Sequence, residues 1–79
     1  MSVQILIVEE ETALAEAIRF GLSTDGFAAE ICATGEDALA FVGRISVDLI
    51  LLDIGLPDTN GFDLFHRLIK ASDAFRFCP

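Results

Sequence analysis

One apolar run that ends in an acid constrains the fold of this chain more than any other feature. Residues 49–52 read Leu-Ile-Leu-Leu, and the run stops at Asp53. A continuous apolar run bounded by turn formers is typical of a parallel strand that is covered on both faces. Pro57 and Gly61 then mark a loop before the next helical pattern. The sequence therefore predicts a buried strand over 47–53 that presents Asp53 at its carboxyl end.

A second strand that ends in acid lies near the N-terminus. Residues 3–8 are mostly apolar and are followed at once by Glu9, Glu10 and Glu11. Parallel strands in an open sheet deliver the side chains at their carboxyl ends to a crevice where ligands bind. Carboxylates crowded there repel one another, and a hard divalent cation such as Mg²⁺ relieves the repulsion. The pattern indicates phosphoryl transfer onto a carboxylate, with the metal neutralising phosphoryl and protein oxygens.

Strand and helix patterns alternate along the rest of the chain, which favours a parallel sheet with right-handed crossovers. Thr34 is a good N-cap, and Asp37 three residues later resembles a capping box. The predicted strands span 3–8, 27–32 and 47–53, and the predicted helices span 12–24, 35–42 and 61–71.

Apolar residues at helical spacing define the face that each predicted helix would bury. The stripe of the first helix contains Leu14, Ile18 and Leu22. In the second helix, the residues expected to face the sheet are Ala38, Leu39 and Val42. The stripe of the third helix consists of Phe62, Leu64, Phe65, Leu68 and Ile69.

Taken together and in order, these motifs resemble a response-regulator receiver domain of two-component signalling, over about residues 3–72. The matching features are the strand and acidic cluster over 5–11, the Gly35-x-x-Ala38-Leu39 helix, the strand over 48–53, and Pro57 with Gly61-Phe62. The resemblance implies a truncated flavodoxin-like three-layer (βα)3 unit of the α/β class, with a parallel sheet in the order 2-1-3. Residues 1–72 would form the truncated receiver domain and residues 73–79 a C-terminal tail.

The resemblance also assigns roles to the acidic residues. Asp53 would be the phosphoacceptor, and Glu9, Glu10, Asp53 and the Gly55 carbonyl would form an Mg²⁺ site. A histidine kinase or another signalling protein would be the partner. Glu10 stands where the family usually has Asp, and its extra methylene moves the carboxylate within a tight octahedral site. The alternative for Glu9, Glu10 and Glu11 is an acidic cluster that complements a helix dipole.

A second departure concerns the end of the chain, which precedes the family's fourth and fifth strands. Those strands carry the Ser or Thr and the Lys that bind the phosphoryl group in the family. We therefore expect a non-enzymatic receiver without an output domain, which acts mainly through protein contacts while phosphorylation at Asp53 is weakened or lost. One alternative is a competent Mg²⁺-dependent phosphoacceptor whose site is completed by a second subunit or the kinase. A further alternative is a remnant that keeps the fold without the function.

The strand over 47–53 would lie at an edge of the sheet, and a long apolar edge is a template for pairing with another chain. We therefore expect a homodimer that extends the sheet through this strand or through the tail. In the tail, Phe75 and Phe77 alternate with Arg76, which allows either a short strand or a frayed terminus.

Length and composition limit the remaining possibilities. The chain has 79 residues, enough for one small domain, and a formal net charge of -8. That charge argues against nucleic acid or an anionic membrane as a direct partner. Cys32 and Cys78 have no metal-ligand spacing and are expected to be free thiols in a reducing compartment. Because no apolar run reaches about 18 residues, we expect a cytoplasmic protein.

Overall fold

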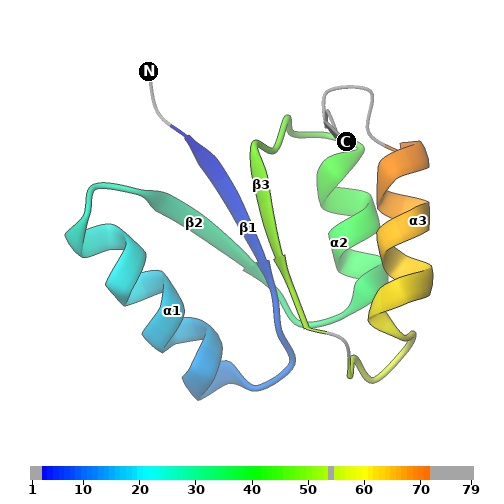
Figure 1. The fold of residues 1–79 in the computed structure, drawn as a ribbon, viewed down its shortest axis with the longest axis horizontal. Coiled ribbons are helices and arrows are strands. Elements are labelled where there is room, and N and C mark those ends of the chain that lie inside the picture. Colours follow the sequence, from blue (N-terminus) through cyan, green and yellow to red (C-terminus); the bar gives the residue numbers. More distant parts are fainter. Residues whose placement is uncertain (1–2, 54, 72–79) are drawn as a thin grey trace.

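The computed structural model describes residues 3–53 and 55–71, along which strands alternate with helices. The elements are β1 (Gln4–Val8), α1 (Thr12–Thr24), β2 (Ala28–Cys32), α2 (Gly35–Val42), β3 (Leu49–Leu52) and α3 (Gly61–Ala71). They form three layers, with the sheet in the middle, α1 on one face, and α2 and α3 together on the other (Figure 1). The predicted α/β class is confirmed.

All the described strands are parallel, in the order β2-β1-β3, as the resemblance implied. In this register, Val8 at the end of β1 pairs with Cys32 of β2 and with Leu52 of β3. The strands therefore end level with one another. Consequently the residues that follow β1 and β3, Glu9 and Asp53, emerge at the same edge of the sheet.

The central strand β1 is buried on both faces because both layers of helices cover it. Leu6 and Val8 pack in the cluster that contains the buried side chains of α2 and α3. Ile5 and Ile7 point the other way and pack with Ala15 of α1. Each of these four side chains is at most 2% exposed. Burying such a side chain contributes about 1.5–3 kcal/mol to stability. Strand β1 therefore connects the hydrophobic clusters on the two faces of the sheet.

The buried stripe of α1 differs in one position from the predicted one. Ala15 is fully buried, and Ile18 and Leu22 are half-buried against the same cluster. Leu14 is 45% exposed, so its predicted place in the stripe is wrong. Because successive helical residues are separated by about 100°, a helix that turns Ala15 to the sheet turns Leu14 away.

The helices on the other face largely follow the prediction. Thr34 caps α2, since its Oγ1 accepts a hydrogen bond from the Asp37 N–H at 3.1 Å. In α3, Leu64 and Leu68 are buried, while Phe62 is 68% exposed and therefore lies outside the stripe. Leu64 and Leu68 are four residues apart, so they lie on one face of the helix and pack beside α2.

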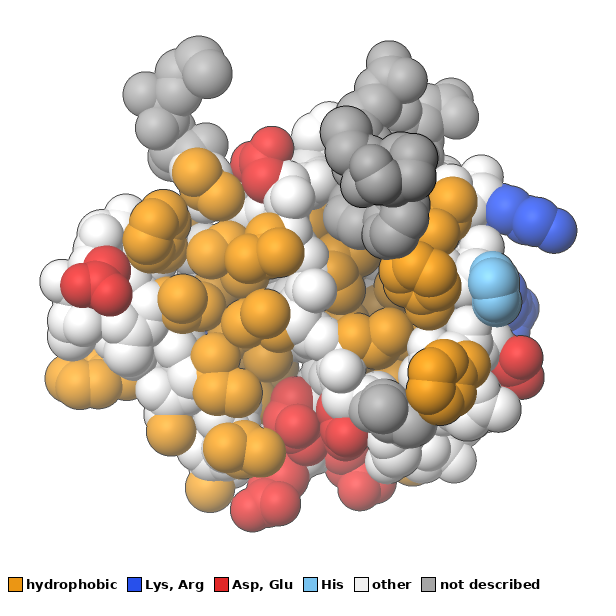
Figure 2. Space-filling model, in the orientation of Figure 1, with side chains coloured by type: hydrophobic (Ala, Val, Ile, Leu, Met, Phe, Trp, Pro, Cys, Tyr) orange, Lys and Arg blue, Asp and Glu red, His pale blue; other side chains and the backbone are white. Residues whose placement is uncertain are grey.

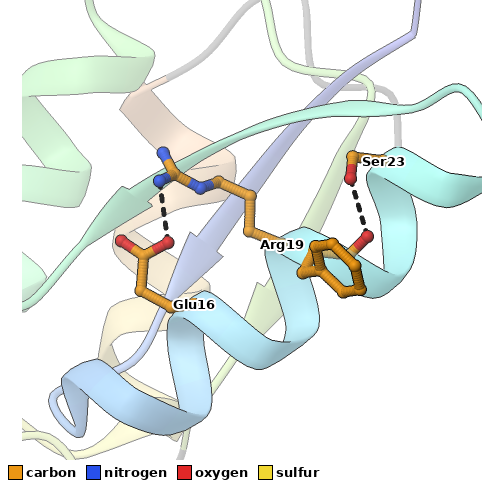
Figure 3. A network of polar contacts seen from close by, with 4 residues as sticks. Glu16, Arg19 and Ser23 are labelled. Atoms are coloured by element: carbon orange, nitrogen blue, oxygen red, sulfur yellow. Dashed lines mark hydrogen bonds and ion pairs between the residues drawn. The ribbon is translucent and has the colours of Figure 1, made fainter.

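The outer face of α1 carries local polar contacts (Figure 3). The Arg19 guanidinium contacts the Glu16 carboxylate at 2.7 Å, and the Ser23 hydroxyl donates to the Phe20 carbonyl at 2.7 Å. An exposed ion pair of this kind contributes about 0.3–0.5 kcal/mol to a helix. These contacts support α1 locally, and the helix packs against the sheet through its opposite, apolar face.

In the described part of the chain, no helix combines the length and apolarity needed to cross a bilayer.

Strand β3 forms one edge of the three-stranded sheet, as predicted for the described part of the chain. Leu49 is 46% exposed on it, and the next three residues are half-buried. Pairing of this edge with a second chain stays a prediction. The predicted tail over 73–79 lies outside the described residues, so the division of the chain at residue 72 also stays a prediction.

Candidate functional site

Asp53 follows β3 directly and is held by backbone contacts on two sides. Its N–H donates to the Val8 carbonyl at 2.9 Å, which continues the ladder between β3 and β1. Its carboxylate is half-buried, and Oδ1 accepts a hydrogen bond from the Gly55 N–H at 3.1 Å. The strand therefore fixes the position of Asp53, and the loop orients its carboxylate.

Glu9 follows β1 in the equivalent position. Its N–H donates to the Cys32 carbonyl at 3.0 Å, so the backbone is fixed by β2. Its Oε2 accepts a hydrogen bond from the Glu11 N–H at 3.1 Å, directly before α1 begins. Glu9 thus makes a local contact just before α1, and its carboxylate stays at the sheet edge; the helix-dipole alternative for the acidic cluster is not tested by this contact.

The structure brings Glu9 and Asp53 together at one open cavity of about 390 Å³. Acidic side chains gather at the end of the molecule where β1 and β3 end, next to an apolar surface over the sheet (Figure 2). Two carboxylates from neighbouring strands therefore face one space that is otherwise apolar. The residues lining the cavity are Ile7, Val8, Glu9, Ile18, Leu51, Leu52 and Asp53.

Glu10 and Gly55, the other two predicted metal ligands, lie outside this lining. Both residues are exposed, and Gly55 pairs with Asn60 in an isolated antiparallel bridge. Within residues 3–53 and 55–71, the structure gathers no group of three His, Cys, Asp or Glu side chains that could hold a metal ion. The four-ligand assignment stays a prediction.

The chemistry of the available donors fits a hard cation. Glu9 and Asp53 offer carboxylate oxygens at the cavity, and Gly55 offers a carbonyl oxygen two residues after Asp53. Mg²⁺ prefers oxygen ligands and binds through one or two carboxylates while it keeps several waters. Two carboxylates at an open cavity are donors of the kind that this ion prefers.

Asp58 has a role that the sequence did not reveal. Its carboxylate accepts hydrogen bonds from the Gly35 N–H at 2.9 Å and the Glu36 N–H at 3.0 Å. These bonds, the first of them above all, hold the pKa of the Asp58 carboxyl below its usual range. Sequence spacing carries no signal for this contact, because a side chain in one loop caps a helix 22 residues earlier.

Asn60 was also missed, although the sequence contains a signal for it. Its Oδ1 accepts a hydrogen bond from the Asp63 N–H at 2.8 Å, and its Nδ2 donates to Asp63 Oδ2 at 3.2 Å. Asn is a preferred N-cap residue, and the Asn-x-x-Asp spacing is visible before α3. The loop after Asp53 thus ends in a capped helix.

The other chemically notable side chains lie away from the cavity. His66 is exposed and stacks edge-on against Phe65, with ring centroids 5.7 Å apart. Cys32 is a buried free thiol, and burial raises its pKa. The free-thiol prediction is confirmed for Cys32, whereas Cys78 lies outside the described residues.

Comparison with known proteins gives a consistent family. Residues 5–76 match the sequence profile of the response regulator receiver domain. The chain is 41% identical over 64 residues to the sensory transduction protein RegX3 of Mycobacterium tuberculosis, covering 81% of this chain and 28% of that protein. It superposes on a CheY-like receiver domain from Methanospirillum hungatei with a TM-score of 0.86 and 34% identity, covering 89% of this chain and 56% of the other. The MaeR response regulator bound to beryllium trifluoride gives a TM-score of 0.83 and 32% identity, covering 92% and 62%.

The chain thus spans less than a third of RegX3 and little more than half of the receiver domain from M. hungatei. Receiver domains are in general signalling modules rather than enzymes; they bind Mg²⁺ at the phosphorylation site, interact with histidine kinases and often dimerise. The profile match over nearly the whole chain, the sheet order and the paired acids at the ends of β1 and β3 agree. This chain belongs to the response regulator receiver domain family of two-component signalling.

Proposed function

We propose that this chain acts mainly through protein–protein contacts, with phosphorylation at Asp53 weakened or lost. The observation that supports this best is the composition of the cavity at the ends of β1 and β3. Glu9 and Asp53 are its only ionisable lining residues among those the structure describes, and apolar side chains form the rest. A phosphoryl group carries several negative oxygens, so a site without a cation among its lining groups binds it poorly.

In this proposal, Glu9, Glu10, Asp53 and the Gly55 carbonyl would hold Mg²⁺ weakly. When bound, the ion would neutralise the charge on phosphoryl and carboxylate oxygens. The Gly55 N–H donates to Asp53 Oδ1 and orients the carboxylate, and Oδ2 would be the nucleophile. Glu10 would have to reach inward from an exposed position in the β1–α1 connection.

The proposed contacts with other proteins centre on the β3 edge. Leu49 is exposed there, and a second cavity of about 300 Å³, lined by Leu52, Gly61, Phe62 and Phe65, lies on the α3 side of the strand. Figure 2 shows apolar side chains spread over this face of the molecule. We therefore propose a homodimer in which β3 pairs with another chain, since an open apolar edge favours such pairing.

The open cavity also supports a second candidate, a competent phosphoacceptor completed by a second polypeptide. A kinase or another subunit could supply the missing cation, as the cavity of about 390 Å³ has room for side chains from outside. The step would form a bond between an Asp53 oxygen and phosphorus while the bond between phosphorus and the kinase histidine nitrogen breaks. The nitrogen would recover a proton from water.

Intact-mass spectrometry separates the two candidates. The chain is incubated with Mg²⁺ and acetyl phosphate, with Asp53→Ala as the control. We expect little or no phosphoryl adduct on either protein. A near-complete adduct on the native chain alone would contradict weakened phosphorylation; an adduct that forms only after a histidine kinase is added would support the second candidate.

The dimer is tested separately by analytical ultracentrifugation. Leu49→Lys places a charge on the β3 edge and should shift the chain towards monomer. Leu14→Lys is the matched control, because Leu14 is equally exposed at 45% but lies on α1. Equal sedimentation of both variants and the native chain would contradict pairing through β3.

A further inference from the structure

Asp58 joins the β3–α3 loop to a helix that lies far back in the sequence. Its Oδ1 and Oδ2 accept the N–H groups of Gly35 and Glu36, which are 23 and 22 residues earlier. The first N–H groups of a helix have no partner within the helix, and a carboxylate there is favoured by the helix dipole. Asp58 therefore closes the N-terminus of α2 from outside.

The same contact is tightly packed. A Cβ added to Gly35 would lie 2.6 Å from Thr59 Cγ2 and 3.3 Å from Leu64 Cδ1. The first of these distances is well below van der Waals contact, so a larger residue at position 35 would require the Thr59 side chain to move. Two successive loop residues, Asp58 and Thr59, thus rest on the start of α2.

Residues 55–60 of the loop are held at two points. Gly55 bridges to Asn60 across the loop, and Leu56 is buried in the core. The Gly55 N–H in turn holds Asp53 Oδ1. Because Asp58 lies between Leu56 and Asn60, a shift of Asp58 moves the short closed segment that carries Gly55.

We infer that Asp58 is a positioning residue that couples the Asp53 site to the N-terminus of α2. It holds the loop on the helix so that Gly55 keeps its place beside Asp53. The metal-dependent part of this inference rests on the proposed function, in which Mg²⁺ binds at Asp53. Because coupling is reciprocal, an ion bound at Asp53 changes the surroundings of the Gly35 and Glu36 amides.

The first test needs no metal. Amide hydrogen exchange is measured by NMR on the ¹⁵N-labelled full chain. Asp58→Ala should speed exchange at Gly35, Glu36 and Gly55 by about tenfold, the size expected for loss of a hydrogen bond to a charged group. Asp25→Ala removes the same charge from an exposed residue after α1 and should leave these amides unchanged. Exchange at Gly55 that is equal in both variants would overturn the inference.

Two further variants address the same contact independently of Asp58→Ala. Gly35→Ala places a Cβ against Thr59 Cγ2. This should displace the loop from α2 and speed exchange at Gly55 in the same way. Combined with Asp58→Ala, it should add little, because both changes break one contact. Asp58→Asn keeps one acceptor oxygen and should restore part of the protection. Fully additive effects would contradict a shared contact.

The second test adds Mg²⁺. In the native chain, the ion should shift the amide resonances of Gly55 and also those of Gly35 and Glu36. In Asp58→Ala, the Gly55 shift should remain and the two α2 shifts should disappear. If Mg²⁺ moves Gly55 in the native chain but leaves α2 unchanged, the coupling is refuted. If it moves no resonance near Asp53, the proposed metal site fails, and the metal-free exchange still decides the role of Asp58.

Discussion

The two loops that carry the acidic residues are held in different ways. After β1, Glu9 contacts the Glu11 N–H two residues on, and Glu10 is exposed. After β3, Leu56 is buried in the core and the Asp58 carboxylate is bound to the start of α2. The first loop depends on local contacts, while the second is fixed by parts of the chain that are distant in sequence.

This difference means that Asp53 is positioned more firmly at the site than Glu10 is. Asp53 takes its position from β3 and from a loop with several tertiary anchors, so substitutions far from it can displace it. Glu10 lies in a loop with few such anchors and can move without disturbing the core. We therefore expect a change between Asp and Glu to have a smaller effect at position 10 than at position 53.

The largest effect is expected from Leu56→Ala, which removes the core anchor of the second loop. Leu56 is 8% exposed, and truncating a buried leucine costs about 2–4 kcal/mol of unfolding free energy. The control Leu14→Ala, at 45% exposure, should stay within about 0.5 kcal/mol. Both are measured by urea unfolding. A Leu56→Ala loss no larger than that of the control would mean that the loop is not anchored through this residue.

A smaller effect that depends on pH is expected for Asp58→Asn. Folding lowers the pKa of Asp58, so its carboxylate stabilises the folded state fully above its usual pKa. That contribution is lost as the pH falls through the lower pKa of the folded state. The native chain should therefore be more stable than Asp58→Asn at neutral pH, and the difference should shrink below about pH 4. Unfolding curves at several pH values test this, and a constant difference would contradict it.

The smallest effect on stability is expected for Glu10→Asp in the first loop. An exposed change of this kind should alter the unfolding free energy by less than about 0.5 kcal/mol. Mg²⁺ affinity should rise by about two- to threefold, because the shorter side chain suits octahedral geometry better. Isothermal titration calorimetry measures the affinity, with Glu11→Asp as the matched control. A large gain in affinity would show that the first loop is as constrained as the second.

Much of the fold was predictable because it depends on local patterns. The predicted bounds of all three helices agree with the structure, since Thr34, Gly61 and the apolar periods mark them within the sequence itself. The strand cores followed from apolar runs. The sheet order followed from family resemblance and not from the residues alone.

What the sequence left open depends on orientation and on distant contacts. Periodicity indicates that a helix has an apolar stripe, but the choice between Leu14 and Ala15 is made by where α1 rests on the sheet. In the candidate site, the nearness of Glu9 and Asp53 follows from parallel strands with matched ends. The bond from Asp58 to Gly35 has no sequence period, so only the folded chain reveals it.

The central position of β1 also bears on how this chain folds as it is synthesised. Its first partner, β2, leaves the ribosome soon after it, but its second, β3, is paired across 44 residues, as Ile5 and Leu49 show. Until β3 and α3 emerge, one side of β1 has no cover, and the nascent chain exposes an apolar strand that a chaperone can bind. Because β1 precedes these partners in the sequence, the core described here is complete only after α3 has left the ribosome.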